Sequence, residues 1–243
     1  MFVATEPLNR ELHKGLRFKP MANLKFAEKV SQVPLSYSEV VKAGRYYPIV
    51  FPLGGAMIPH AVLSLRKNHN SYLSPDGKWM VPYIPMHIMR YPFVLGTSTM
   101  AQAADAAPEA ETNFIVCIDR QAENFKGNEG TELFTESGEP TESTAKAIDF
   151  LKKFKMELDV TEKLFGLLAE HDCLVKKQLT MDVDGAAQSA GAFQVADLSK
   201  IKDLDGAVLK EWAANGLLGL IYAQNFSLAN LDRFADQLSK AKN

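Results

Sequence analysis

The chain has 243 residues, of which 47% are hydrophobic and 23% are charged. These proportions are those of an ordinary globular protein, and they exclude the collagen-like, coiled-coil and wholly disordered classes. The formal net charge of -2 conceals an asymmetry: residues 1–100 carry 12 Lys and Arg against 5 Asp and Glu, whereas residues 101–243 carry 15 against 24. The two parts could attract each other, or one face could meet an oppositely charged partner. Because the basic residues are dispersed, we expect no nucleic-acid binding.

Cysteine content and hydropathy restrict the compartment. Cys117 and Cys173 both lie in apolar stretches, and two cysteines are too few for a disulfide framework, so buried free thiols are expected. No window of about 18 apolar residues occurs, which predicts that the protein is not an integral membrane protein. The first residues lack the basic start, apolar run and cleavage site of a signal peptide. These features predict a cytoplasmic protein.

Turn-forming residues divide the first part of the chain into short elements. Gly44 is expected to end a helix as a C-terminal glycine does. Pro75 and Gly77 have the chemistry of a hairpin turn, and Pro92 prevents a short helix from continuing. In chain order the predicted elements are a helical turn over 37–42, buried strands over 46–51 and 61–66, a hairpin over 71–80 and a short helix over 86–91.

Longer elements are predicted in the second part. Apolar residues at helical spacing after Thr141 predict a helix to about residue 171, with an interruption near Asp159. The other expected elements are a surface loop over 101–111, a strand over 113–119, a loop over 127–140, strands over 179–183 and 192–195 around a loop at 185–191, and helices over 207–215, 217–223 and 228–239. Together they predict a mixed α+β fold with a mainly antiparallel, short-stranded sheet, a long helix and C-terminal helices.

Common catalytic and metal-binding motifs are absent from the sequence. None of the five histidines stands at helical spacing from a second ligand in a metal-binding pattern, so no metal site is predicted. The chain also lacks the Gly-x-Ser-x-Gly motif, the phosphate-binding loop and the Gly-x-Gly-x-x-Gly motif. Serine-hydrolase and nucleotide chemistry are therefore not favoured, and no cofactor is predicted.

One acidic constellation is a candidate for catalysis. Asp119 is expected to emerge at the end of a buried strand, with Glu129, Glu132 and Glu139 in the loop that follows. Two neighbouring carboxylates can separate their pKa values and divide acid and base work. A solvated loop is the alternative interpretation. His13 and Arg17 form a second candidate pair, for acid–base and anion-holding roles.

A proline-interrupted aromatic segment is the candidate binding surface. It comprises Trp79, Tyr83, Arg90, Tyr91 and Phe93. Aromatic residues and Arg act as anchors for a protein or peptide because they bury a large area and keep a polar group. The alternative is that they form a core between the hairpin and the short helix.

His87 stands one helical turn before Arg90. The pair could bind an anion on one face of the short helix. Packing of Arg90 over its aromatic neighbours is the alternative.

Several segments together resemble the SapC family, which is named for a protein tied to bacterial surface-layer export. The resemblance covers nearly the whole chain in the family's order, which implies a single domain over 1–243, with any sub-division near 101–111. At position 224 this chain has Gln where relatives carry a His. The matching segments are Leu12–Arg17, Val33–Leu35 with Glu39, Tyr47–Phe51, Leu63–Arg66, Tyr72–Phe93, Cys117–Asp119, Leu133–Phe134 with Gly138–Thr141, Leu220–Ala223 and Ser227–Leu231.

The resemblance implies a cytoplasmic accessory to surface-layer or envelope protein traffic, and it brings no catalytic residues. The first hypothesis is therefore a non-enzymatic protein that recognises a protein or peptide partner. Two alternatives remain. One is an enzyme that acts on peptide or glycan by acid–base chemistry. The other is a structural subunit of a larger assembly, such as a homo-oligomer formed through the C-terminal helices.

Overall fold

The computed structural model describes residues 1–21, 23–97, 114–183, 186–232 and 234. The predicted loop over 101–111 and half of the predicted last helix over 228–239 lie outside these residues. Within the described residues the protein has an α+β fold with one long helix and several short antiparallel sheets, which confirms the predicted fold class.

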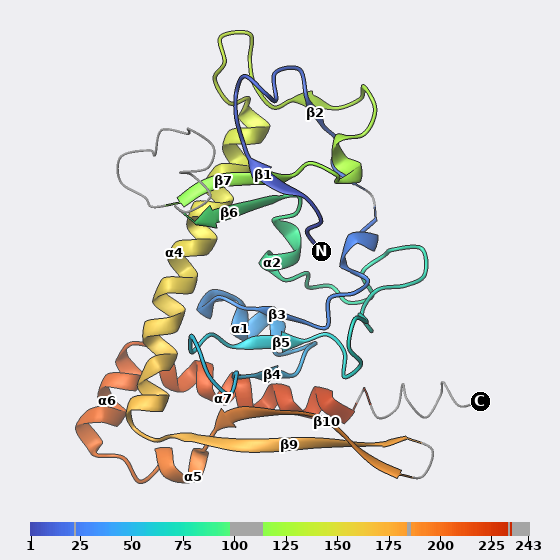
Figure 1. Cartoon of the computed structure of the whole chain (residues 1–243). Helices are drawn as coiled ribbons and strands as arrows, with labels where there is room; N and C mark the ends of the chain where they lie inside the picture. Colours follow the sequence, from blue (N-terminus) through green and yellow to red (C-terminus); the bar gives the residue numbers. More distant parts are fainter. Residues whose placement is uncertain (22, 98–113, 184–185, 233, 235–243) are drawn as a thin grey trace.

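The upper sheet in Figure 1 contains three antiparallel strands in the order β1-β7-β6. The central strand β7 (Phe114–Asp119) pairs on one side with β1 (Thr5–Pro7) and on the other with β6 (Phe93–Thr97). Above this sheet, β2 (Arg17–Phe18) forms a two-residue pairing with β8 (Thr131–Glu132). The predicted strand over 113–119 is confirmed, and the predicted loop over 127–140 contains the short strand β8.

The lower sheet has the order β3-β5-β4, formed by Gln32–Pro34, His60–Val62 and Ile49–Val50. A backbone bridge between Phe51 and Gln194 joins it to a long hairpin of β9 (Leu174–Val183) and β10 (Ala186–Ala196). The two predicted short strands are thus the ends of much longer ones. The small residues that suggested a loop over 185–191 are tolerated because the pairing of the hairpin supplies the backbone hydrogen bonds.

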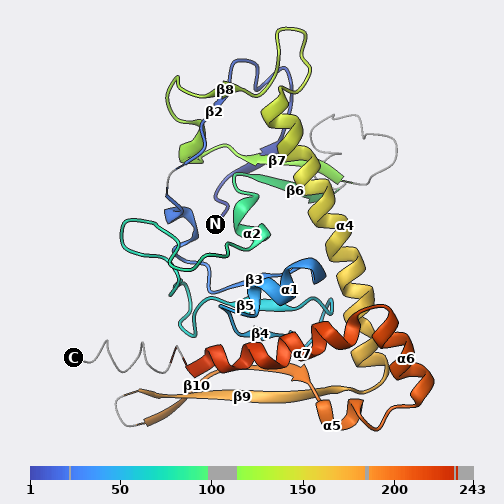
Figure 2. The same ribbon diagram turned by 180° about the vertical axis from the view of Figure 1, so that it is seen from behind.

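The longest helix, α4 (Glu142–Glu170), runs beside both sheets (Figures 1 and 2). It begins after Thr141, as predicted. The predicted interruption near Asp159 is wrong, because this half-exposed carboxylate pairs with Lys155 one turn earlier on the helix surface. The other helices are α1 (Tyr37–Ala43), α2 (Met86–Met89), α5 (Leu198–Ile201), α6 (Gly206–Ala214) and α7 (Leu217–Ser227), with short 3-10 turns at Lys25–Ala27, Glu123–Phe125 and Leu228–Asn230.

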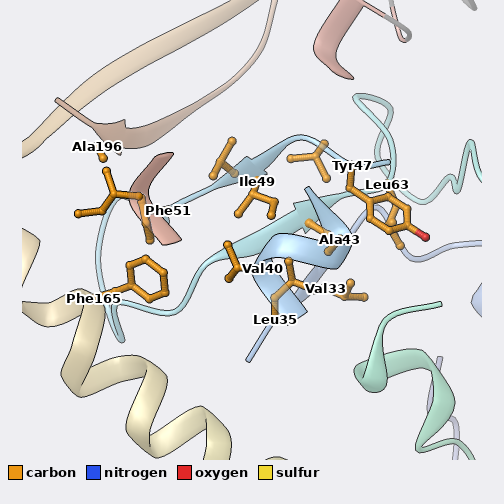
Figure 3. Close-up of a cluster of buried hydrophobic side chains, with 14 of the residues drawn as sticks. Val33, Leu35, Val40, Ala43, Tyr47, Ile49, Phe51, Leu63, Phe165 and Ala196 are labelled. Atoms are coloured by element: carbon orange, nitrogen blue, oxygen red, sulfur yellow. The ribbon is translucent and has the colours of Figure 1, made fainter. Parts of the chain in front are cut away.

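Two clusters of buried side chains stabilise the fold. The lower cluster packs the lower sheet against α1, α7 and β10 (Figure 3), and α4 contributes Phe165 and Leu168 to it. The upper cluster contains Phe93, Ile118 and Phe125, and α4 contributes Leu151. The long helix therefore connects the two clusters through residues about four turns apart.

Several local predictions need correction in detail. The hairpin over 71–80 turns at Gly77, which has φ +83°, but it is held by a single bridge between Leu73 and Trp79 rather than by strands. The strand expected over 61–66 ends at Val62, since the amides of Leu63 and Ser64 both donate to the carbonyl of Ser31. The short helix after Pro85 is confirmed over Met86–Met89, with Arg90 as its C-cap.

Gly44 ends α1, as expected, but for a different reason. Its φ is -59°, so no left-handed conformation is needed. A Cβ atom there would lie 3.0 Å from the carbonyl oxygen of Val40 and 3.3 Å from that of Ala223 on α7. The missing side chain permits the close approach of α1 and α7.

A Gly44→Ala substitution should therefore lower the free energy of unfolding by about 1 to 3 kcal/mol through overpacking. Gly166→Ala is the matched control, because no atom lies within 4 Å of the added Cβ and the helical φ is normal. It should leave stability unchanged or raise it by up to about 1 kcal/mol. Urea unfolding measures both, and a harmless Gly44→Ala would contradict the packing argument.

Candidate functional site

Asp119 is fully buried at the end of β7, and does not emerge at the sheet edge as expected. Its two carboxylate oxygens accept hydrogen bonds from the backbone amides of Val3 at 2.9 Å and Ala4 at 3.0 Å. The hydroxyl of Tyr91 donates to the same carboxylate at 3.4 Å, and burial raises the pKa of this phenol to about 12. The carboxylate thus holds the N-terminal segment against the upper sheet.

None of the acidic residues expected around Asp119 forms a pair with it among the described contacts. Glu129 pairs with Lys19, Glu132 pairs with Arg17 at 2.7 Å, and Glu139 is exposed. The structure therefore gives no shared carboxylate pair among these residues. An acid–base role for Asp119 stays a prediction.

His13 and Arg17 are also engaged within the fold. The imidazole of His13 is 2% exposed; its Nδ1 accepts from the amide of Asn9 at 2.9 Å. The ring proton is therefore on Nε2, which donates to Glu6 at 2.8 Å. Arg17 donates to Glu132 and to the carbonyl of Gly130 across the β2–β8 pairing. Both side chains hold loops in place, and their use in catalysis stays a prediction.

An Asp119→Asn substitution should lower the free energy of unfolding by about 1 to 3 kcal/mol, because an amide nitrogen cannot accept from a backbone N–H. Glu129→Gln is the control, since Glu129 is exposed and solvent screens its ion pair with Lys19, so its stability should stay close to that of the wild type. Urea unfolding of both variants tests this. An Asp119→Asn variant as stable as the wild type would remove the structural role and favour a chemical one.

Trp79 and Tyr83, from the predicted binding surface, belong to an internal hydrogen-bond network. The indole nitrogen of Trp79 donates to the hydroxyl of Tyr47 at 2.7 Å and to the carbonyl of Tyr83 at 3.1 Å. The Tyr83 hydroxyl donates to Glu39 at 2.9 Å. Glu39 is 1% exposed and also accepts from the amides of Ser36 and Met86. Burial raises the pKa of this carboxyl, and the hydrogen bonds oppose that shift.

Phe93 and Tyr91 likewise make ring contacts inside the fold. Phe93 is 4% exposed and packs edge-on against Phe18 in the upper cluster. Tyr91 stacks on Phe26 with ring centroids 3.9 Å apart. The predicted aromatic surface is thus largely occupied by neighbours within the chain, and recognition of a partner by these residues stays a prediction.

Arg90, the fifth residue of that surface, contacts Phe2 of the N-terminal segment and His87 of α2. Its guanidinium lies 5.3 Å from the ring centre of Phe2, and Nη2 lies 3.3 Å from Nε2 of His87. Burial lowers the pKa of Arg90 to about 10. Burial, followed by the charge of Arg90, lowers the pKa of His87 to about 3.

The low pKa of His87 predicts a pH dependence. An unfolded histidine titrates near 6.5, so the unfolded chain binds a proton below this pH while folded His87 stays neutral down to about pH 3. The free energy of unfolding should consequently fall as the pH decreases from 6.5, by up to about 1.4 kcal/mol per pH unit from this residue. A His87→Gln variant should show a shallower fall in urea unfolding between pH 7 and pH 4.5. Parallel curves for the two proteins would contradict the assignment.

A groove of about 650 Å³ lies between α4 and the start of β7, and we call it the α4 groove. Its apolar lining includes Leu8, Leu95, Phe114, Ile115, Ile148 and Met156. Arg10, Lys152 and Lys155 provide basic groups at the groove, and Asp159 is the one acidic residue among the described lining residues. The ammonium group of Lys155 pairs with Asp159 and lies 4.7 Å from the ring centre of Phe114.

Two smaller depressions adjoin the α4 groove through shared residues. One, of about 170 Å³, shares Arg10, Phe134 and Gly138 with it. The other, of about 350 Å³, shares Lys152 and Met156 with the groove. It continues along α4 to Val160 and is also lined by Tyr37 of α1. The sequence alone does not predict this site, because the lining residues of the α4 groove come from five segments that are distant in the chain. The one local signal is that exposed Met156 and Val160 interrupt an otherwise charged helix face.

Gln224, the position at which the sequence departs from the expected family pattern, is fully buried. Its amide nitrogen donates to the carbonyl of Ile49 at 2.8 Å, and its oxygen accepts from the amide of Ala196 at 3.3 Å. This side chain connects α7 to both β4 and β10. In this chain the position therefore has a structural role.

In the described part of the chain, no helix has the length and hydropathy needed to cross a membrane. The same residues contain no group of three or more His, Cys, Asp or Glu side chains arranged to hold a metal ion. The SapC family model matches residues 8–234, which is nearly the whole chain. No curated protein and no solved structure matches it.

Proposed function

The chain belongs to the SapC family, and we propose that it is a non-enzymatic accessory protein that binds an extended segment of a partner protein. The observation that carries this proposal is the α4 groove together with its two adjoining depressions. A small ligand would occupy one cavity, whereas a succession of connected depressions suits an extended chain. Met156 and Val160, which are 69% and 49% exposed, offer apolar contacts along it.

The start of β7, where the described strands leave the side of β1 unpaired, supports an extended conformation for the bound segment. The pairing of β7 with β1 covers Cys117 to Asp119, and the amide of Leu8 donates to the carbonyl of Val116. On that side, no described strand pairs with Phe114 or Ile115, which both line the groove. A peptide can add to such an edge through its backbone while alternate side chains enter the groove.

Charge indicates the chemistry of the segment. Among the described residues that line the α4 groove itself, three are basic and one is acidic and paired with Lys155. The two adjoining depressions add both signs, with Glu11, Glu136, Asp149 and Glu157 beside Lys14 and Lys153. Electrostatic complementarity favours a partner of opposite charge. Where it crosses the α4 groove itself, the partner segment should therefore alternate apolar side chains with acidic ones.

The family name is the basis on which we assign the partner to a cellular pathway. SapC is named for a protein tied to bacterial surface-layer export, so we assign the partner to surface-layer or envelope protein traffic and the binding event to the cytoplasm. The internal engagement of Asp119, His13 and Arg17 favours binding over catalysis. Self-association stays a prediction; Tyr222 and Phe226 on α7, which are 49% and 77% exposed, would be its contacts.

A labelled ten-residue peptide that alternates Leu or Ile with Glu should bind the full chain in fluorescence anisotropy. Met156→Glu should weaken this binding at least about tenfold, since the added charge repels the peptide and contributes no apolar contact. Met89→Glu is the matched control, because Met89 is 59% exposed and lines none of the three depressions. Equal binding by both variants, or by a peptide with Lys in place of Glu, would refute the groove as the site.

The pathway is tested by cross-linking in the host cell. A photoreactive residue at position 156 should form an adduct with a surface-layer or envelope protein, and the same residue at position 89 should not. An adduct formed only with a protein that has no role in surface-layer or envelope traffic would contradict the assigned pathway. The peptide-binding result would be unaffected.

A further inference from the structure

Helix α2 presents a positive charge that no described acidic residue neutralises. Arg90, its C-cap residue, is largely buried, yet no described carboxylate lies within ion-pair distance of its guanidinium. A buried charge without a counter-ion is strongly unfavourable, so buried guanidinium groups are normally paired. In both views α2 lies between the upper and lower sheets (Figures 1 and 2).

Arg90 and His87 also hold hydrogen-bond donors that have no acceptor. Because Nη2 of Arg90 donates to Nε2 of His87, the ring proton of His87 is on Nδ1. Both Nδ1 of His87 and Nε of Arg90 are buried and find no partner among the described residues. Nε of an arginine lies on the guanidinium edge that receives a carboxylate or phosphate in bidentate geometry.

The other groups that face this pair add to its positive character. Arg90 is the charged neighbour of His87, and burial lowers the pKa of nearby His60. Phe154 of α4 packs edge-on to the His87 ring, and Phe2 lies against the guanidinium. The surroundings of the pair are thus apolar or cationic, which favours an anion.

We propose that Arg90 and His87 form a binding site for an oxyanion, the carboxylate or phosphate group of a ligand. The Nε and Nη2 edge of Arg90 holds two oxygens, and the Nδ1 proton of His87 provides a further donor from the neighbouring side chain. Both residues keep part of their surface exposed, and the proposal requires their side chains to rotate so that the buried donors reach the anion. This site is separate from the α4 groove, because neither residue lines it.

Titration of the full chain with inorganic phosphate and with acetate tests the site, with chloride at matched ionic strength as the reference. The wild type should gain about 3 to 6 °C in Tm at an anion concentration ten times Kd, and the gain should saturate. Arg90→Met should lose this gain. Arg66→Met, which removes an exposed arginine elsewhere, should respond as the wild type does.

The behaviour of the variants separates a binding role from a structural one. Without anion, Arg90→Met should be at least as stable as the wild type, because it removes an unpaired buried charge. A structural arginine would instead lower Tm when replaced, with the response to anion unchanged. If Arg90→Met fails to fold, Arg90→Lys keeps the charge without the bidentate edge and should weaken binding at least about tenfold.

The separate titrations with phosphate and with acetate identify which group the site binds. A response to phosphate alone, or to acetate alone, supports the site and names the group it binds. The same rise in all proteins, Arg90→Met included, is a general salt effect and overturns the proposal. Nitrogen shifts of the His87 ring in NMR provide the second readout, since anion binding should perturb Nδ1 in the wild type; an unchanged ring at saturation also overturns it.

Discussion

The buried carboxylate of Glu39 is the interaction on which the arrangement of the middle of the chain depends. One side chain on α1 accepts from the amide of Ser36, from the hydroxyl of Tyr83 and from the amide of Met86 where α2 begins. Burial disfavours its charge, and the three donors offset that cost. Because these donors come from segments more than 40 residues apart, α1 fixes the starting point of α2 and hence the approach of α2 to the upper sheet.

This constraint explains why the aromatic segment lies mostly inside the fold. Once Tyr83 is bonded to Glu39, its carbonyl can receive the indole nitrogen of Trp79 as well as the hydroxyl of Tyr47. The indole N–H of Trp79 and the hydroxyl and carbonyl of Tyr83 are therefore already hydrogen-bonded within the chain. Among the described residues, Arg90 at the C-terminal end of α2 and its neighbour His87 keep buried donors without a partner.

The local patterns of the sequence predicted those elements that depend on neighbours in the chain. The long helix follows from the apolar period after Thr141, and β7 follows from its apolar run. The role of Asp119 could not be read in this way, because its partners Val3 and Ala4 lie more than 100 residues earlier in the chain. The α4 groove is likewise a product of tertiary packing, in which residues of β1, β7 and α4 meet.

The fold offsets part of the uneven distribution of charge along the sequence. Arg17 and Lys19 of the basic first part pair with Glu132 and Glu129 of the acidic second part. These pairs hold the β2 and β8 segments together across more than 100 residues of sequence. Arg90 also belongs to the basic part, but it is largely buried and has no such pair among the described residues, and this combination favours an anionic ligand.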